Sequence, residues 1–199
     1  MGDMTAEGVE AVIFDFDGTL TVPVLDFDVI REEIGLEPGP ILEALEHKDD
    51  AFRQHAFSII ENHERRAAEE AELQDSALRV LDAITASGIP TAILTRNARA
   101  HVSSVMEKFG VEVAELRARE DCAIKPAPDG ILSICESLSV DPGRTWMIGD
   151  YKYDIQAGNR AGSTTALLTT EEPLPDYAAE ADHVIPDLPS LLPLLRLGA

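Results

Sequence analysis

The chain has 199 residues, of which 45% are hydrophobic, which is enough for one large domain or for one domain with a small insert. Its formal net charge of −21 argues against nucleic acid as a partner, because so acidic a surface repels phosphate backbones. No apolar run is long enough to span a membrane, and residues 1–5 lack the basic and apolar pattern of a signal peptide.

The first predicted element is a buried strand over residues 9–15, and two carboxylates stand at its end. Asp15 and Asp17 are separated by one residue, and residues two apart on an extended chain point to the same side. Gly18 then permits a sharp turn and a close approach of a ligand to the backbone. Two adjacent carboxylates repel each other, so a proton or a bound cation has to compensate for their charge.

Residues 22–73 follow with helical periodicity and without any strand signal. We expect one short helix over residues 26–34, a second around residues 41–45 and a third that begins near residue 52. Residues 61–72 carry charges around most of the helix surface, which is typical of a solvated face. The pattern predicts a small α-helical cap over residues 22–73, inserted into a core domain made of residues 1–21 and 74–199.

From residue 76 onward, strands and helices alternate. The predicted strands cover residues 91–94, 111–113, 145–148, 164–168 and 183–185. Helices are predicted around residues 78–88, 97–109, 131–138 and 153–161, with Asn97 as an N-cap, and a proline-interrupted helix closes the chain over residues 188–197. The alternation predicts an α/β fold, a Rossmann-like parallel sheet with helices on both faces. Ligands of such folds bind beyond the carboxyl ends of the strands.

Polar side chains gather at those predicted strand ends. Thr95 follows the second strand, Asp150 follows the fourth, and Lys125 lies in a loop before a helix. Each has a simpler explanation by itself. The pair of aspartates after the first strand suits an Asx turn, Thr95 suits a helix cap, and a lone lysine is usually solvated. Because all of them converge on one edge of the sheet, the sequence predicts a functional site there.

Four segments, taken together, resemble the haloacid dehalogenase-like hydrolase superfamily, and within it the phosphoglycolate-phosphatase-like branch with a helical cap. In chain order they are Asp15-Phe16-Asp17-Gly18-Thr19-Leu20, Ile93-Leu94-Thr95-Arg96-Asn97, Lys125-Pro126-Ala127-Pro128-Asp129 and residues 148–158. The resemblance covers nearly the whole chain outside the cap. The sequence departs from the family pattern at two places. Thr21-Val22-Pro23 stands where the family often has an acidic residue and a serine. Tyr151 stands where the family often has a serine. We expect them to bear on the substrate and not on the chemistry.

The resemblance implies a Mg²⁺-dependent phosphatase that acts on a small phosphomonoester through an aspartyl-phosphate. Asp15 would be the nucleophile, and Asp17 would protonate the leaving alcohol and then activate water. The implied catalytic residues are Asp15, Asp17, Thr95 and Lys125. The implied phosphate- and substrate-binding residues are Gly18, Thr95, Arg96, Asn97 and Lys125. The implied metal ligands are Asp15, Asp17 through its backbone carbonyl, Asp150 and Asp154.

Some of these roles have alternatives. Asp154 lies one helical turn beyond Asp150, where it would hold a metal-bound water, orient Lys125 or simply pair with a nearby cation. Arg96 suits a surface position as well as a leaving-group contact. Tyr151 and Tyr153 either flank the site or pack on the next helix.

Other functions fit the same motifs. A phosphotransferase or sugar-phosphate mutase would pass the phosphoryl group to a second hydroxyl, and a binding protein would keep the fold without turnover. A dehalogenase is disfavoured because its chemistry has no use for an acid at Asp17 or for Mg²⁺. We expect a small phosphorylated metabolite as partner and neither nucleic acid nor membrane; oligomeric state leaves no signal in the sequence.

Cysteine content suggests the compartment. Cys122 and Cys135 are too few for a disulfide framework, so we expect free thiols and a cytoplasmic protein. The acidity suits a soluble surface, and adaptation to high salt is the alternative reading of the same composition.

Overall fold

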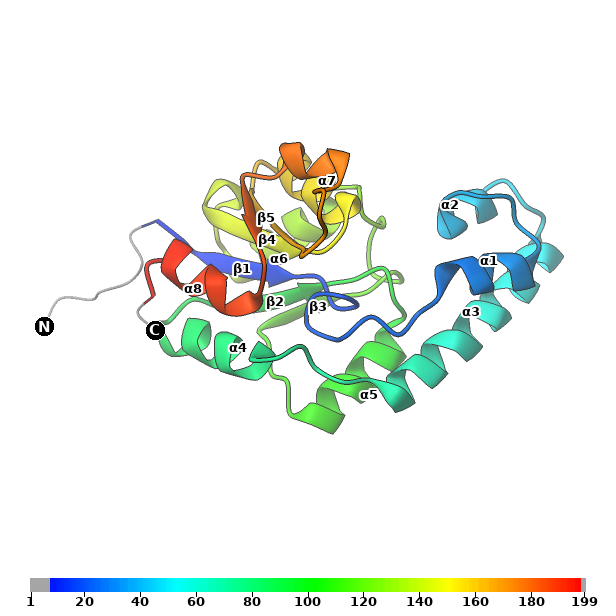
Figure 1. Cartoon of the computed structure of the whole chain (residues 1–199), viewed down its shortest axis with the longest axis horizontal. Coiled ribbons are helices and arrows are strands. Elements are labelled where there is room, and N and C mark those ends of the chain that lie inside the picture. Colours follow the sequence, from blue (N-terminus) through cyan, green and yellow to red (C-terminus); the bar gives the residue numbers. More distant parts are fainter. Residues whose placement is uncertain (1–7, 198–199) are drawn as a thin grey trace, which may run out of the picture.

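A computed structural model describes residues 8–197 and shows a six-stranded sheet whose paired strands all run parallel (Figure 1). The strand order is β3-β2-β1-β4-β5-β6. The strands are β1 (Ala11–Phe14), β2 (Thr91–Leu94), β3 (Glu115–Arg117), β4 (Thr145–Gly149), β5 (Thr164–Leu168) and β6 (His183–Ile185). The parallel α/β sheet predicted from the sequence is confirmed. Residues 1–5, where no signal peptide is expected, lie outside the described residues.

Successive residues of β1 enter two different hydrophobic layers. Val12 and Phe14 pack into one buried cluster and Ile13 into another, because neighbouring side chains of a strand point to opposite faces. The first layer contains α4 (Ala77–Ala86), α5 (Arg99–Phe109) and α8 (Leu191–Leu194), and the second contains α6 (Asp129–Leu138) and α7 (Lys152–Ala161). Helices therefore cover both faces of the sheet, as predicted.

The direction of the chain reverses beside β1. From β1 the chain adds β2 and β3 toward one edge of the sheet, and it then returns to add β4, β5 and β6 toward the other. In open parallel sheets a crevice forms at such a switch point, beyond the carboxyl ends of the strands. Asp15 lies there, and its backbone N–H donates to the carbonyl of Ile148 at 2.8 Å, which ties the end of β1 to β4.

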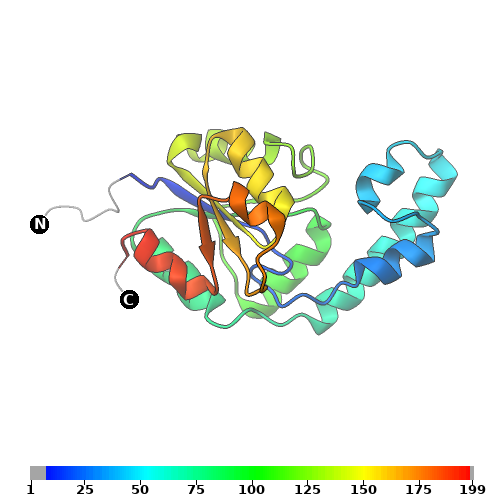
Figure 2. The ribbon, with the colours of Figure 1, turned by 45° about the horizontal axis from the view of Figure 1, so that its top comes forward.

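Three of the four helices between β1 and β2 in the chain stand to one side of the sheet (Figures 1 and 2). They are α1 (Phe27–Ile34), α2 (Ile41–Leu45) and α3 (Asp50–Glu70). Asp26 caps α1 by accepting from the N–H groups of Asp28 and Val29, and Gly35 ends it with a left-handed φ of 80°. Most buried apolar side chains of these three helices form a cluster of their own, separate from the two layers on the sheet, whereas Ala68 near the end of α3 packs against the first layer. We refer to residues 22–73 as the helical insert.

Two predicted elements differ from the structure. The strand expected over residues 111–113 is wrong, and β3 is the polar segment Glu115–Arg117 instead. β3 pairs only with β2 and is half-buried, so it needs no apolar run. The closing helix is a 3₁₀ turn (Leu188–Ser190) followed by the short α8, because Pro189 and Pro193 interrupt helical hydrogen bonding.

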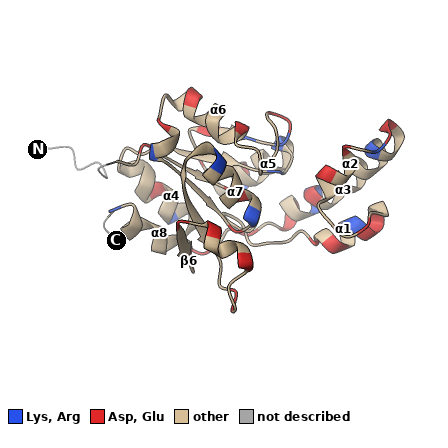
Figure 3. Ribbon diagram, turned by 90° about the horizontal axis from the view of Figure 1, so that it is seen from above, with Lys and Arg blue, Asp and Glu red and all other residues tan. Residues whose placement is uncertain are grey.

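The surface and the cysteines agree with the composition. Acidic residues lie on helices of the insert and of the layers that cover the sheet (Figure 3). Cys122 and Cys135 are both free thiols, as expected. Across residues 8–197, no helix combines the length and the apolar character needed to cross a membrane.

Gly158 sets how closely α7 packs on the sheet. A Cβ atom at this position would lie 2.4 Å from Cγ2 of Thr165 and 3.2 Å from Cβ of Met147. We predict that Gly158→Ala lowers the free energy of unfolding by about 1–3 kcal/mol through overpacking, despite the better helix propensity of alanine. Urea denaturation measures this. Gly143→Ala, in a turn with ordinary contacts, is the matched control, and an equally stable Gly158→Ala would contradict the packing argument.

Candidate active site

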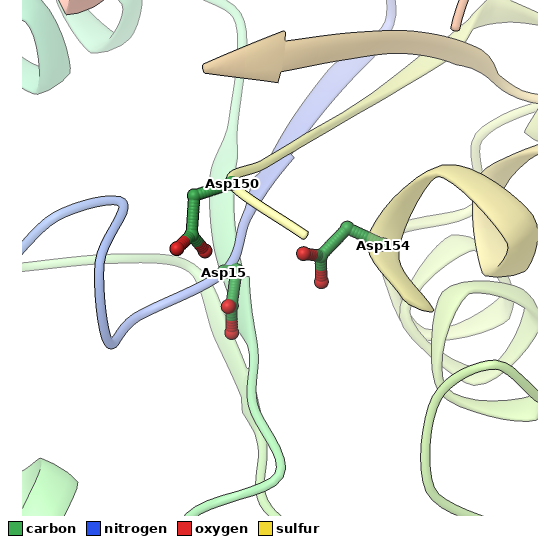
Figure 4. Close-up of side chains that lie close together, drawn as sticks. All are labelled: Asp15, Asp150 and Asp154. Carbon is green, nitrogen blue, oxygen red and sulfur yellow. The ribbon is translucent and has the colours of Figure 1, made fainter. Parts of the chain in front are cut away.

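Three carboxylates from separate segments point toward one another at the crevice (Figure 4). Asp15 follows β1, Asp150 follows β4, and Asp154 lies in the first turn of α7. One oxygen atom from each carboxylate lies within 4.8 Å of one from the other two. These three side chains are named the carboxylate cluster below.

A buried lysine holds two members of this cluster. The Nζ atom of Lys125 lies 2.6 Å from Oδ1 of Asp15 and 2.6 Å from Oδ1 of Asp154, and the lysine side chain is only 2% exposed. The solvated-lysine alternative is therefore wrong. Oδ2 of Asp154 also accepts from the backbone N–H of Tyr151 at 3.1 Å, so its carboxylate is fixed from both sides. Of the roles considered for Asp154, pairing with and orienting Lys125 is the one that these contacts support.

The charges in the cluster do not balance. Burial would lower the pKa of Lys125, but the charges of Asp15 and Asp154 raise it above its usual value, so this side chain is an ammonium. Burial raises the pKa of Asp15 well above its usual value, against the opposing effect of Lys125. Burial and the charge of Asp154 raise the pKa of Asp150 to about 7. The cluster thus has three carboxyl groups for one ammonium, which contacts only Asp15 and Asp154, and this all-oxygen donor set suits a divalent cation such as Mg²⁺.

Gly18 allows the turn after β1 to approach Asp150. Its φ of 82° is left-handed, and a Cβ atom would lie 2.2 Å from Oδ2 of Asp150. The next residue, Thr19, donates its hydroxyl to Oδ1 of Asp150 at 3.4 Å. A side chain at position 18 would therefore push Asp150 out of the cluster.

Asp17 lies outside the carboxylate cluster and is held by Asn97. Nδ2 of Asn97 donates to Oδ2 of Asp17 at 3.0 Å. Burial raises the pKa of Asp17, although the bond from Asn97 and the charge of Lys125 lower it. The N-cap expected at Asn97 is wrong: the N-cap position of α5 is Ala98, whose side chain makes no capping hydrogen bond, and Oδ1 of Asn97 accepts from the N–H of Ala98 at 2.7 Å. Oγ1 of the buried Thr95 accepts from the backbone N–H of Asn97 at 3.0 Å.

Arg96 joins the site to the insert. Its guanidinium donates to the carbonyl of Lys125 at 2.9 Å and to Oε2 of Glu43, on α2, at 2.8 Å. The same group lies over the ring of Tyr153, 4.4 Å from its centroid. Arg96 is half-buried among these partners, so the alternative of a free surface arginine is wrong.

A second ion pair between the insert and the core was not predicted from the sequence. Glu64, in the segment expected to be solvated, is only 4% exposed and pairs with both terminal nitrogens of Arg119, one of them at 3.0 Å. Nε2 of His101 lies 4.0 Å from the same carboxylate. Burial raises the pKa of Glu64 against the opposing effect of Arg119. The sequence did contain a sign that Glu64 is buried, because Glu64 lies four residues after Ile60, on the apolar face of α3.

A cavity of about 670 Å³ connects these groups to the insert. The carboxylate cluster, Asp17, Thr95 and Lys125 line one part of it, and side chains of α1, α2 and α3 line another. All the sequence-predicted site residues except Gly18 therefore line one cavity, Arg96 and Asn97 among them. Gly18 lies against Asp150.

Comparisons with known proteins agree on one family of hydrolases. A family model described as haloacid dehalogenase-like hydrolase matches residues 9–162. A haloacid dehalogenase-like hydrolase domain-containing protein of Arabidopsis thaliana is 30% identical over 173 residues, which cover 80% of this chain and 71% of that protein. The N-acetylmuramic acid 6-phosphate phosphatase of Pseudomonas putida is 25% identical over 186 residues, covering 80% and 82%.

The fold agrees with a solved structure as well. The crystal structure of a predicted phosphoglycolate phosphatase from Haemophilus somnus superposes with a TM-score of 0.72 and 19% identity, covering 96% of this chain and 99% of that one.

The buried pair of Glu64 and Arg119 predicts a strong effect on stability. We expect Arg119→Met to lower the free energy of unfolding by about 3 kcal/mol, because it leaves a buried carboxylate without its partner. The double variant Glu64→Leu with Arg119→Met should recover most of that loss in urea denaturation. Arg65→Met is the control: it removes an exposed pair with Glu69, and should change stability by less than about 1 kcal/mol. If Arg119→Met lowered the free energy of unfolding as little as Arg65→Met does, the pair of Glu64 and Arg119 would not be important for stability.

The raised pKa of Asp150 predicts a site that weakens the fold when no cation is bound. Between the ordinary pKa of an aspartate and about 7, the folded chain keeps a proton that the unfolded chain has lost, so stability falls as pH rises through this range. In EDTA at pH 8, Asp150→Asn should therefore melt at a higher temperature than the unsubstituted chain, by about 2–4 °C for each kcal/mol of relieved repulsion.

Mg²⁺ should raise the melting temperature of the unsubstituted chain and leave that of Asp150→Asn nearly constant. Asp82→Asn, on the exposed side of α4, should behave like the unsubstituted chain under both conditions. A lower melting temperature for Asp150→Asn in EDTA at pH 8 would contradict the charge argument.

Proposed function

The chain belongs to the haloacid dehalogenase-like hydrolase family and is a phosphoric monoester hydrolase, and we propose that it cleaves small phosphomonoesters through an aspartyl-phosphate on Asp15. The observation that carries the proposal is the contact of the buried Lys125 with Asp15 at 2.6 Å, beside Asp150 and Asp154. A carboxylate attacks a phosphate dianion slowly unless positive charge screens the two, and Lys125 supplies such charge at the nucleophile.

Each step has a group suited to it. Asp15 attacks phosphorus as the bond to the leaving oxygen breaks, and Asp17 gives its proton to that oxygen. Water then attacks the aspartyl-phosphate while Asp17 takes a proton back, which releases phosphate and regenerates Asp15. Burial raises the pKa of Asp17, which favours the protonated form needed in the first step, and the hydrogen bond from Asn97 fixes its orientation.

Thr95 is suited to bind the phosphoryl group. Its oxygen accepts from the N–H of Asn97, so its hydroxyl hydrogen is directed elsewhere and can be donated to a phosphate oxygen. Backbone N–H groups of Gly18 and Arg96 are further donors in this role. Lys125 balances the charge of the phosphate together with that of Asp15.

Mg²⁺ is the cation that the donor set favours. Asp15, Asp150 and the backbone carbonyl of Asp17 would hold it, with Asp154 alongside, and it would supply positive charge to the phosphate and the nucleophile. The excess of carboxylates over ammonium groups in the cluster supports this assignment.

We also propose that residues 22–73 form a cap domain over a core of residues 1–21 and 74–199. The separate hydrophobic cluster of the insert supports a distinct unit. Its ion pairs from Glu43 to Arg96 and from Glu64 to Arg119 hold it against the core beside the cavity. The two free thiols, Cys122 and Cys135, suit a reducing, cytoplasmic setting.

Substitution of the two aspartates tests the mechanism. With Mg²⁺ and phenyl phosphate, we expect Asp15→Asn to release no measurable phosphate, and Asp17→Asn to lose about 10²–10⁴-fold in kcat while keeping its melting behaviour. EDTA should stop the unsubstituted enzyme, and added Mg²⁺ should restore it.

Asp82→Asn again serves as the control and should hydrolyse phenyl phosphate at the unsubstituted rate. Full activity of Asp15→Asn would remove this residue from the role of nucleophile. Added alcohols separate hydrolysis from phosphoryl transfer: a phosphatase keeps releasing inorganic phosphate, whereas a phosphotransferase or mutase accumulates a new phosphate ester.

A further inference from the structure

We infer that the leaving group of the natural substrate is a hydrophobic alcohol, alkyl or aryl, and not a polyhydroxylated sugar. The inference rests on the proposed phosphatase function and concerns the part of the cavity beyond the phosphoryl site. At about 670 Å³ the cavity is far larger than a phosphate ion requires, so its remaining walls face the leaving group. The chemistry of those walls identifies the class of alcohol.

The wall contributed by the insert is largely apolar. Its apolar members are Leu25, Phe27, Ile30, Ile41, Leu42 and Ile60. Phe27 is 55% exposed and does not belong to the hydrophobic cluster of the insert, so its ring is not needed to hold the helices together. Exposing such a ring to water costs free energy that an apolar ligand would recover.

The wall contributed by the core presents aromatic rings. Tyr151 and Tyr153 both line the cavity, with ring centroids 5.1 Å apart in an edge-to-face arrangement. Tyr177 supports Tyr151 from behind, with centroids 5.6 Å apart. Tyr151 is nevertheless 45% exposed, so part of its ring remains available to a ligand. It stands next to Asp150, and hence close to where a phosphoryl group would sit.

The arginines in the walls already have partners. Arg31 donates to the carbonyl of Gly39 and pairs with Asp28, Arg96 is bound to Glu43, and Arg119 to Glu64. Among the described residues, Lys152 is the lining cation with no carboxylate at ion-pair distance, and its ammonium lies over the rings of Tyr151 and Tyr153.

The amide of Asn97 is likewise engaged, with Asp17 and with the N–H of Ala98. A sugar brings several hydroxyls that lose their water on binding, and each needs a donor or an acceptor in exchange. Apart from Lys152 and the hydroxyls of Tyr151 and Tyr153, the walls offer few groups for that purpose and much apolar surface, so they favour an alcohol that gains from leaving water.

A series of phosphate esters of primary alcohols tests the inference, because their leaving-group acidities are similar. The probes are ethyl phosphate, hexyl phosphate, glycerol 3-phosphate and glucose 6-phosphate, with acetyl phosphate as the minimal substrate, all with the full chain and Mg²⁺. We expect kcat/KM for hexyl phosphate to exceed that for ethyl phosphate by at least tenfold, since each buried methylene contributes up to about fourfold. The two polyhydroxylated esters should not exceed ethyl phosphate.

Wall variants tie the preference to the structure. Phe27→Ala and Tyr151→Ser should each reduce the ratio of kcat/KM between hexyl and ethyl phosphate by about three- to tenfold. Tyr151→Phe should keep the ratio, because the ring and not the hydroxyl makes the wall. Val29→Ala is the matched control for Phe27: it is on the same helix and 48% exposed, and it does not line the cavity. Melting curves verify that all four variants fold.

The outcomes are distinct. An equal kcat/KM along the alkyl series, or a clear preference for glucose 6-phosphate or glycerol 3-phosphate, would overturn the hydrophobic leaving group and leave the phosphatase proposal intact. A preference that persists in both Phe27→Ala and Tyr151→Ser would overturn the assignment of these walls. Absence of phosphate release from every probe, acetyl phosphate included, would overturn the phosphatase proposal and this inference with it.

Discussion

Repulsion among buried carboxylates is the constraint on which the site depends. Asp15, Asp150 and Asp154 are brought within 4.8 Å of one another, and Lys125 offsets only part of their charge. Such an arrangement is unfavourable for folding, because each carboxylate is removed from water and placed beside another. The raised pKa of Asp15 and Asp150 expresses that cost. A site that destabilises itself in this way is poised to bind a cation, which relieves the repulsion.

The rest of the fold offsets this cost and holds the geometry. Central strands with fully buried residues fix the ends from which Asp15 and Asp150 project. Gly18 lets the following turn approach Asp150 to a distance that no side chain would allow. The capping contact from the N–H of Tyr151 orients Asp154, and Asp154 in turn orients Lys125. The site is therefore rigid because neighbouring backbone groups, and not long side chains alone, position its charges.

The net charge of the protein does not determine the charge that a substrate meets at the candidate active site. The chain carries −21 in total, yet its candidate active site places Lys125 at the nucleophile and favours a divalent cation beside it. Charges at the surface are screened by salt over about 10 Å, whereas buried pairs are screened much less. An acidic protein can thus accept an anionic substrate. The leaving group meets a different environment, in which the arginines are paired within the protein and the remaining walls are apolar.

The sequence by itself determined the α/β class and the residues at the strand ends. Periodicity identifies strands and helices, and in a parallel sheet the carboxyl ends of all strands meet at one edge. Asp15, Thr95 and Asp150 could therefore be grouped without coordinates. Only the tertiary structure decided which residue pairs with Glu64, since its partner Arg119 lies 55 residues away along the chain. It also decided that Asn97 holds Asp17 instead of capping a helix, and that β3 is a polar edge strand. The physical reason is the same in each case: periodicity reports which side of an element faces the interior, whereas a hydrogen bond or ion pair depends on which distant segment packs there.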